Sequence, residues 1–600
     1  MSARLAALRG LMAKHAVAVY LVPAGDEHGN EYPAAHKRRR EAISGFGGSA
    51  GELAVCETDA HLFVDSRYHR QAQSEVPDGL FALHKLGLEG EQDLYAWLRA
   101  HDQAHGPLRV GFDPFLVNLR VHGKLAAALE KEGSSLQPIR QNLVDEVWAE
   151  RPEAGFEAAF ALPDAITGET VADKLARVRQ AMADAGAGAL VLTRLDEVAW
   201  LTNLRGSGIP YSPVFEAYLL VEAEGAACFT DTPVPQSARE PLRGLVEIRP
   251  YGEFADAVAR AARAAAEKGS PLWLDSDSAS EGLRLLTGEA PVHQSPPNPV
   301  VKFKAVKNPV EIEGMREGHV KAGLAKVRAF SLLSARLAEG ERLSEADFAE
   351  LLEKEYAREE GFRDLSFATI SAFGPNGAVV HYGTPDPAVL LEPGGMLLVD
   401  SGVQLLGATT DDTRTVAIGT PTRRQRERYT DVLRAHIGLA MQVFPSGTNG
   451  QMLDAIARSP LWNNGLDFGH GTGHGVGAFL NVHEGPQAIS PTNTVALEAG
   501  MIVSNEPGYY RAGWGGIRLE NLYLVDRAPG LRAHPAGKTW LRMVPLTLIP
   551  FDRNLIDPRR MTQPERAWLE DYHRTVAQTL APLLAEPHRA WLAEACQAVG

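Results

Sequence analysis

Three features are scarce in this 600-residue sequence, namely cysteine, long apolar runs and an excess of positive charge. The three cysteines are Cys56, Cys228 and Cys596, and they are too few and too scattered for a disulfide framework or a zinc finger. No run reaches the ~18 apolar residues that a membrane-spanning helix needs. The short apolar run at residues 16–23 is typical of a strand rather than of a secretion signal. We therefore expect a cytoplasmic protein with unpaired thiols and no membrane contact.

The charge balance argues against a nucleic-acid-binding protein. The formal net charge is −15, and no basic stretch with interleaved aromatic residues occurs, which argues against nucleic-acid binding. Hydrophobic residues make up 45% and charged residues 22% of the chain, values that are ordinary for a soluble globular protein. A chain of 600 residues is too long for a single hydrophobic core, so we expect two to four domains.

A proline-rich stretch at residues 295–299 is the clearest domain boundary in the chain. Before it, helix-like and strand-like patterns alternate, which is typical of α/β domains. The pattern occurs twice, because Leu175, Val178 and Met182 stand 170 positions after Leu5, Leu8 and Met12. We predict two α/β domains at residues 1–152 and 153–300, followed by a larger domain at residues 301–600.

The last domain contains five residues with the right chemistry for a metal site. They are four carboxylates and one imidazole: Asp400, Asp411, His474, Glu506 and Glu520. A site with so much oxygen suits manganese, cobalt or zinc. Four buried negative charges without cations would be far too costly, so two divalent ions fit better than one. Each residue alone would more often be a turn or loop residue, and the prediction depends on the complete set.

Local patterns predict how four of these residues meet. The apolar run at residues 395–399 indicates a buried strand that ends at Asp400, and residues 409–418 indicate a returning strand that carries Asp411. The same arrangement recurs, with residues 501–503 before Glu506 and a returning strand at residues 517–524 that carries Glu520. Two hairpins would then each present two carboxylates at one end of a sheet, beside a glycine-rich loop with His474.

Helix starts are also visible in the last domain. Asn308 with Pro309 and Glu311, Ser344 with Asp347, Thr422 with Gln425, and Thr562 with Glu565 each predict a helix N-terminus. A further short strand is expected at residues 546–549, where Pro550 would end it. Helices that alternate with hairpins predict a sheet covered by helices.

Three motifs around the five residues are long and specific. They occupy residues 374–382, 470–486 and 505–510. They resemble the metallopeptidase family with the pita-bread fold, which includes methionine aminopeptidase, prolidase, aminopeptidase P and creatinase. The closer resemblance is to the long, three-domain form of Xaa-Pro aminopeptidase, and it extends over nearly the whole chain. One departure is that Gly407-Ala408 precedes Thr409-Thr410-Asp411, where the family usually has Asp-Gly, and we expect only a different turn shape.

The resemblance implies a fold, a cofactor and a role for each ligand. Two creatinase-type α/β domains would precede a pita-bread catalytic domain. Manganese is the implied metal, and the ligand set also allows cobalt or zinc. Asp400 would bind one ion, Asp411 and Glu520 would bridge both ions, and His474 and Glu506 would bind the second. Glu506 would also act as general base toward a metal-bridged hydroxide that attacks the peptide bond.

Four further residues acquire expected roles from the same motifs. His381 and His483 resemble residues that bind the scissile region and stabilise the tetrahedral intermediate. His470 resembles the residue that lines the pocket on the proline side of the bond. Arg518 either contributes to the substrate site or forms a salt bridge with a neighbouring acid. Tyr382, Val476 and Tyr509 are weaker candidates for the wall of a proline pocket.

The implied activity is hydrolysis of the N-terminal Xaa-Pro bond of peptides whose second residue is proline. One alternative is prolidase, which cuts only Xaa-Pro dipeptides, and the long N-terminal half argues against it. Another alternative is a binding protein on the same fold that has lost its metal ligands, whereas all five ligands are present here. The long relatives are dimers, so a homodimer is expected as well.

Overall fold

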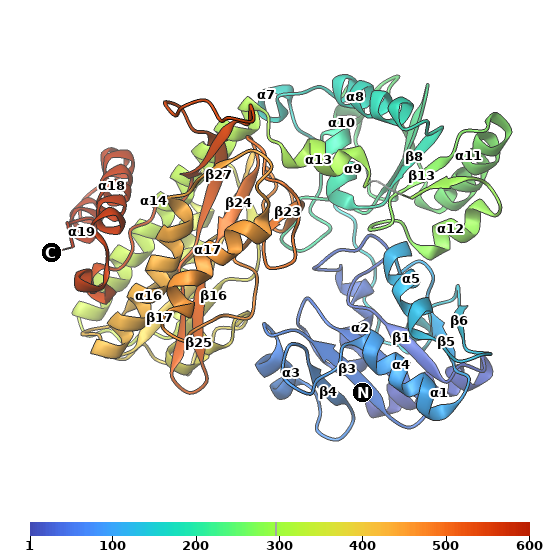
Figure 1. Ribbon diagram of the computed structural model, residues 1–600, viewed down its shortest axis with the longest axis horizontal. Helices are drawn as coiled ribbons and strands as arrows, with labels where there is room; N and C mark the ends of the chain where they lie inside the picture. Colours follow the sequence, from blue (N-terminus) through green and yellow to red (C-terminus); the bar gives the residue numbers. More distant parts are fainter. Residues whose placement is uncertain (295–296, 600) are drawn as a thin grey trace. The chain divides into compact units, whose positions relative to one another are not determined.

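The computed structural model describes residues 1–294 and 297–599 (Figure 1). Contacts divide the chain into an N-terminal unit, Met1–Asp164 with Glu169–Val301, and a C-terminal unit, Ala165–Gly168 with Lys302–Gly600. The division into three domains stays a prediction. Ser295 and Pro296 of the predicted linker lie outside the described residues, and Pro299 begins helix α13 (Pro299–Ala305).

The N-terminal unit contains two six-stranded sheets with the same topology. Their strand orders are β4-β3-β2-β1-β5-β6 and β12-β11-β10-β8-β13-β14. In each sheet one central strand, β1 (Val19–Val22) or β8 (Ala189–Leu192), has an antiparallel neighbour on one side and a parallel neighbour on the other. The same order and the same strand directions support the internal repeat that the sequence indicates.

The other strands and the larger helices of this unit have the following bounds. The other strands are β2 (Glu52–Cys56), β3 (Ala60–Val64), β4 (Ala82–Lys85), β5 (Arg109–Phe112), β6 (Ser135–Pro138), β10 (Tyr218–Glu222), β11 (Ala226–Phe229), β12 (Glu247–Arg249), β13 (Leu272–Leu274) and β14 (Val292–His293). The larger helices are α1 (Ser2–Lys14), α4 (Leu94–His105), α5 (Leu119–Ala128), α8 (Val171–Asp184) and α11 (Phe254–Lys268). The predicted triplets are confirmed as the buried stripes of α1 and α8.

All four predicted helix starts of the C-terminal unit are confirmed. Capping boxes begin α14 (Pro309–Ala338), α15 (Glu345–Ala357), α16 (Arg423–Ala440) and α18 (Gln563–Leu580). Each box pairs a cap side chain with a backbone N–H of the first turn, so four helices start at positions that local sequence determines. Helices α17 (Gly450–Trp462) and α19 (His588–Ala595) complete the larger helices of the unit.

The strands of the C-terminal unit form several small sheets and one of six strands, in the order β21-β28-β27-β24-β22-β23. The bounds are β15 (Phe362–Leu365), β16 (Ile370–Phe373), β17 (Met396–Ser401), β18 (Val403–Leu405), β19 (Ala408–Thr409), β20 (Asp412–Ala417), β21 (Val443–Pro445), β22 (Gly473–Gly475), β23 (Glu484–Ile489), β24 (Ile502–Asn505), β25 (Gly508–Arg511), β26 (Gly515–Arg518), β27 (Asn521–Arg527) and β28 (Trp540–Pro545). Apolar clusters lie between these strands and helices α14, α15, α16 and α18.

Two predicted returning strands are interrupted. The strand expected at residues 409–418 breaks after Thr409, because β19 pairs with β18 whereas β20 pairs with β17 in another sheet. The strand expected at residues 517–524 breaks in the same way, since β26 pairs with β25 and β27 joins the six-stranded sheet. Asp411 and Glu520 therefore lie at points where the chain passes from one sheet to the next.

The strand expected at residues 546–549 is wrong, because β28 ends at Pro545. The buried Arg414 side chain explains the difference. Its guanidinium donates to the carbonyl oxygens of Ile549, at 2.7 Å, and Pro550, at 3.2 Å. These backbone acceptors therefore pair with a side chain instead of a neighbouring strand.

His573 on α18 makes the C-terminal unit sensitive to acid. Its buried Nε2 accepts a hydrogen bond from the Phe551 N–H at 3.1 Å, so the ring is neutral. Burial lowers the pKa of His573 to about 3. The unfolded chain would take up this proton below about pH 6.5 while the folded chain would not. Stability is therefore lost as the pH falls from 6.5 toward 3, by up to roughly 4 kcal/mol.

We expect His573→Gln to flatten this acid dependence, since a glutamine oxygen can accept the same hydrogen bond without titrating. Thermal unfolding at pH 7.5 and pH 4.5 would show a smaller loss of Tm in the variant than in the wild type. His534→Gln, in a loop of the same unit, is the matched control and should leave the wild-type loss unchanged. An equal loss in all three proteins would show that His573 is not the titrating group.

Candidate metal centre

The five predicted metal ligands converge on one place in the C-terminal unit. Carboxylate oxygens of Asp400, Asp411 and Glu520 lie within 4.8 Å of one another, and so do ligand atoms of His474, Glu506 and Glu520. The two groups share Glu520, and His474 Nε2 lies 3.3 Å from Asp411 Oδ2. One cluster of potential ligands is thus formed by four carboxylates and one imidazole, which come from a stretch of about 120 residues.

The pleat of β17 decides where Asp400 points. Leu397 and Val399 pack into the apolar cluster that contains residues of α14 and α15. Successive side chains of a strand face opposite sides, so Asp400 lies on the other face, together with Leu398. The other three carboxylates stand between strands, Asp411 after β19, Glu506 after β24 and Glu520 after β26. Asp400 therefore meets the three carboxylates of the sheet junctions.

Close packing explains the glycines on either side of His474. The short strand β22 has β23 on one side and β24 on the other. A Cβ atom on Gly473 would lie 1.9 Å from the Ser504 carbonyl oxygen, and one on Gly475 would lie 2.3 Å from the Glu484 carbonyl oxygen. Only glycine permits this approach. His474 Nδ1 contacts the Gly475 carbonyl oxygen at 2.9 Å, which leaves Nε2 toward the carboxylates.

The electrostatics of the cluster indicate a need for cations. Burial raises the pKa of Glu506 to about 7, and burial followed by the charges of Asp411, Glu506 and Asp400 raises the pKa of Glu520 well above its usual value. Burial would lower the pKa of His474, but Asp411 and Glu506 outweigh it and raise this pKa to about 9. The two glutamate shifts reflect burial first and then the neighbouring carboxylates, whereas the His474 shift reflects its acidic partners.

Arg518 offsets part of this charge. Its Nη2 donates to Asp400 Oδ2 at 2.6 Å, and only 2% of the residue is exposed. The salt bridge to a neighbouring acid, which was one of the two roles expected for Arg518, is therefore present. The other oxygen, Asp400 Oδ1, is buried and has no hydrogen-bond partner among the described residues. This unpartnered oxygen and the donor set fit a pair of divalent ions.

Tyr510 is a member of this site that the sequence analysis missed. Its hydroxyl contacts Arg518 Nη1 and His470 Nε2, each at 2.8 Å. The neighbouring Tyr509 was expected to line the proline pocket, but it faces the other side of β25 and packs in the core near Trp514. Alternation along the strand is the physical reason. Val476, another candidate for the pocket wall, is fully buried in the core, and its role in the pocket stays a prediction.

The three predicted histidines lie near the cluster to different degrees. His483 packs edge-on against His474 with ring centroids 4.4 Å apart, and its ring forms a potential ligand group with Asp411 and His474. His470 Nδ1 lies 3.9 Å from Glu506 Oε2. His381 is half-buried and follows Val380, whose carbonyl oxygen accepts a hydrogen bond from Arg518 at 3.3 Å.

Family models match almost the whole chain. Residues 313–527 match metallopeptidase family M24, and residues 539–599 match the C-terminal region of that peptidase family. Residues 4–147 and 150–311 each match the creatinase/prolidase N-terminal domain. The family models thus cover both the repeated topology of the N-terminal unit and the metal-ligand cluster of the C-terminal unit.

Individual relatives match over their full length. A probable Xaa-Pro aminopeptidase P from Coprinopsis cinerea is 41% identical, with 98% of this chain and 97% of that protein covered. One from Penicillium rubens is 40% identical, with 100% and 99% covered. This chain belongs to the Xaa-Pro aminopeptidase P family. It is a metallopeptidase of family M24 with two creatinase-type domains and a pita-bread domain.

Solved structures separate this family from the dipeptidases. An X-prolyl aminopeptidase from Caenorhabditis elegans, described as a cytosolic enzyme with a di-nuclear active site, matches with a TM-score of 0.92 and 32% identity over 99% of both chains. An Xaa-Pro dipeptidase from Bacillus anthracis matches with a TM-score of 0.51 and 26% identity, and covers only 64% of this chain. The aminopeptidase P architecture includes both N-terminal domains, which favours it over prolidase.

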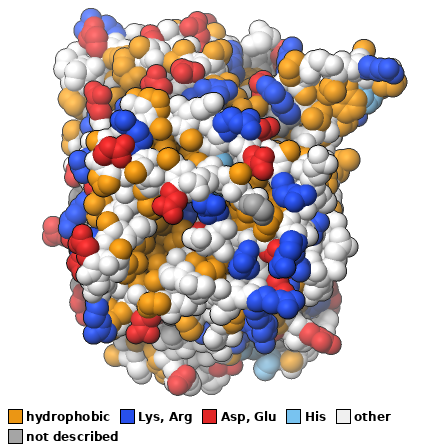
Figure 2. All heavy atoms as spheres, turned by 90° about the vertical axis from the view of Figure 1, so that its left-hand side faces the viewer, with side chains coloured by type: hydrophobic (Ala, Val, Ile, Leu, Met, Phe, Trp, Pro, Cys, Tyr) orange, Lys and Arg blue, Asp and Glu red, His pale blue; other side chains and the backbone are white. Residues whose placement is uncertain are grey.

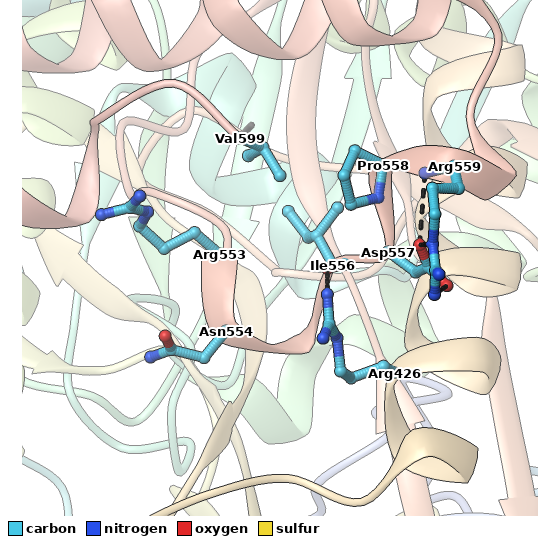
Figure 3. Close-up of a pocket in the computed structure, with 8 residues that line it drawn as sticks. All are labelled: Arg426, Arg553, Asn554, Ile556, Asp557, Pro558, Arg559 and Val599. Atoms are coloured by element: carbon cyan, nitrogen blue, oxygen red, sulfur yellow. Dashed lines mark hydrogen bonds and ion pairs between the residues drawn. The ribbon is translucent and has the colours of Figure 1, made fainter.

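This member of the Xaa-Pro aminopeptidase P family also has a cavity that is separate from the metal-ligand cluster. Figure 3 shows this cavity of about 560 Å³, lined by Arg426, Arg553, Asn554, Ile556, Asp557, Pro558, Arg559 and Val599. Arg559 pairs with Asp557 at 2.9 Å, and Arg426 donates to the Ile556 carbonyl oxygen at 2.7 Å. None of the nine predicted site residues lines this cavity.

Charged side chains of both signs are mixed on the surface of the molecule (Figure 2). Figure 2 shows acidic and basic side chains mixed over one face of the molecule, with apolar side chains between them. Among the described residues, no helix is both long enough and apolar enough to span a bilayer.

Removal of metal should destabilise the C-terminal unit, because the four carboxylates then repel one another. We expect Mn²⁺ added to metal-stripped protein to raise the Tm, and the gain in stability at 100 times the Kd is about 2.7 kcal/mol. Asp400→Asn should reduce this gain, whereas Asp571→Asn, an exposed residue of α18, should not. Differential scanning calorimetry of the three proteins measures the effect. An unchanged Tm on addition of Mn²⁺ would contradict a metal site at this cluster.

Proposed function

We propose that this chain removes the first residue of peptides in which proline is the second residue. The observation that carries the proposal is the convergence of Asp400, Asp411, His474, Glu506 and Glu520 in a chain of the Xaa-Pro aminopeptidase P family. The substrate is a peptide longer than two residues. Prolidase remains the alternative function, and a catalytically inactive binding protein is disfavoured by the complete ligand set.

The five clustered residues would hold two divalent ions, with manganese as our first choice and cobalt or zinc as alternatives. Such ions polarise the scissile carbonyl and lower the pKa of a water molecule. By the family resemblance, Asp400 would hold one ion, His474 and Glu506 would hold the other, and Asp411 and Glu520 would serve both. Glu520 is also the residue common to the two groups of ligand atoms.

The remaining side chains have roles in proton transfer and substrate binding. Glu506 takes a proton from the attacking water and passes it to the proline nitrogen, which has to leave as a protonated secondary amine. His381 and His483 bind the scissile region and stabilise the charge that develops on the carbonyl oxygen. His470 is held by Tyr510 at 2.8 Å and faces the proline side of the bond.

Arg518 is a positioning residue in this proposal. It donates to Asp400 at 2.6 Å and to Tyr510 at 2.8 Å, so one guanidinium connects a metal ligand with the partner of His470. These two hydrogen bonds explain why an arginine is buried at this point. A lysine could not reach both partners, because it lacks the fork of the guanidinium.

The test is the hydrolysis of a proline-second tripeptide and of the matching Xaa-Pro dipeptide, on metal-stripped protein with Mn²⁺ added back. We expect release of the first residue from the tripeptide, only with the ion present. Glu506→Gln should lower kcat by about 100-fold or more, since it removes the general base. Glu498→Gln, which breaks only an exposed pair with Lys302, should not. Cleavage of the dipeptide alone would favour prolidase, and no cleavage with any ion would favour the binding protein.

We also propose that the protein is a cytoplasmic homodimer. All three cysteines are free, as expected in a reducing compartment. Met441, Val443, Met452 and Trp462 are 38–58% exposed and lie at the end of α16, in β21 and in α17. Since α16 and α17 pack on each other, these apolar side chains offer a surface for a second copy.

Sedimentation equilibrium at micromolar concentration tests the dimer, with an expected mass of twice 64.9 kDa. Met452→Lys should shift the mass toward that of one chain, because it places a charge among the four exposed apolar residues. Leu583→Lys is the matched control, since Leu583 is equally exposed but lies in the 3₁₀ turn after α18. A monomeric wild type would refute the proposal.

A further inference from the structure

The N-terminal unit contains a second group of metal-ligand side chains, at the turn between β2 (Glu52–Cys56) and β3 (Ala60–Val64). Cys56 Sγ, a carboxylate oxygen of Asp59 and a ring nitrogen of His61 lie within 4.8 Å of one another. The group lies outside the C-terminal unit that holds the five ligands described above. Its chemistry also differs, because it includes sulfur.

The register of the hairpin brings the three side chains to one face of the sheet. Ala54 pairs with His61, so these two residues share a face, and Cys56 lies two positions after Ala54 on that same face. The Cys56 N–H donates to the Asp59 carbonyl oxygen at 2.9 Å, which closes the turn and places Asp59 opposite Cys56. The backbone thus sets the arrangement before any ion binds.

His84 is the hydrogen-bond partner of His61 Nδ1, and the position of the His84 proton sets the tautomer of His61. Glu91 Oε2 lies 3.6 Å from His84 Nδ1, and His84 Nε2 lies 3.0 Å from His61 Nδ1. With the His84 proton on Nδ1 toward Glu91, His84 Nε2 accepts the proton of His61 Nδ1. His61 Nε2 is then left with a lone pair toward Asp59 and Cys56. Metal-binding histidines typically have such a partner on the other ring nitrogen.

His61 Nε2 faces the Asp59 carboxylate. This nitrogen is buried, and Asp59 Oδ2 lies 3.2 Å from it as its ion-pair partner. In the tautomer given above, this nitrogen and the carboxylate are both acceptors, with no proton between them. Such a pair is favourable when a cation lies between its members.

The surroundings fix the ligands and leave a path for an ion. His84 stacks on Phe63 with ring centroids 4.4 Å apart, and Trp97 of α4 packs against His61 at 4.5 Å. Cys56 is 4% exposed, whereas the Asp59 side chain is 55% exposed. The carboxylate therefore connects a nearly buried thiol and imidazole with the solvent.

We propose that Cys56, Asp59 and His61 bind a zinc ion, with solvent as the fourth ligand. One sulfur, one nitrogen and one oxygen donor are the ligand types that zinc takes in proteins. Binding replaces the thiol proton of Cys56, which is released to solvent, and it changes no oxidation state. The ion would join the end of the β2–β3 hairpin and so stabilise the N-terminal unit. This proposal does not depend on the proposed peptidase activity.

Cobalt titration of metal-stripped, full-length protein tests the site, because a cobalt–thiolate bond gives a charge-transfer band in the near ultraviolet. The five ligands of the C-terminal cluster include no sulfur, so this band reports on Cys56 alone. We expect the band in the wild type and its loss on addition of zinc. Cys56→Ser and His61→Gln should each abolish it. His84→Leu, which removes the partner of His61, should weaken cobalt binding by about 10–100-fold.

Cys596→Ser is the matched control and should retain the full band, since its thiol lies in the C-terminal unit. Circular dichroism identifies any variant that fails to fold. If Cys56→Ser does not fold, His61→Gln and His84→Leu still decide the question, because both keep the thiol. No band at cobalt concentrations that saturate the C-terminal cluster, or a band unchanged in the histidine variants, would overturn the proposal. The three residues would then be only a hydrogen-bonded hairpin end.

Discussion

The accumulation of buried negative charge is the constraint on which the catalytic half of this protein depends. Asp400, Asp411, Glu506 and Glu520 meet where burial raises the pKa values of three of them, Asp400, Glu506 and Glu520. A single guanidinium, that of Arg518, pairs directly with the group. Buried carboxylates at this density are stabilised by cations, so the stability of this region and the binding of metal ions depend on the same residues.

The architecture provides the ligands through junctions between sheets. Asp411 and Glu520 each lie at a break between two strands that belong to different sheets, and Glu506 lies between β24 and β25. At these breaks the chain leaves one sheet for another, and the ligand atoms of the three carboxylates lie in overlapping groups within 4.8 Å. Rigid strands on both sides hold each carboxylate, which gives the precision that a two-metal site requires.

The N-terminal unit contains two six-stranded sheets with the same topology, but the two sheets carry different side chains. The hairpin of β2 and β3 ends in Cys56, Asp59 and His61, with His84 and Glu91 behind them. The corresponding strands of the second copy, β10 and β11, carry the buried Cys228, whose side chain lies in apolar surroundings. Duplication conserves strand order, whereas the group of potential metal ligands at the hairpin end is found in the first copy among the described residues.

Local sequence patterns determined the helix starts, the buried stripes of α1 and α8, the repeat and the five candidate ligands. These features depend on neighbouring residues or on specific motifs, and both are readable in a linear chain. Only the tertiary structure decided that the strands around Asp411 and Glu520 break, that Tyr510 rather than Tyr509 reaches His470, and that Arg518 pairs with Asp400. The Cys56 group was equally hidden, since the contact between His61 on β3 and His84 on β4 joins two strands. Pairing between distant strands determines these contacts, and no local pattern encodes it.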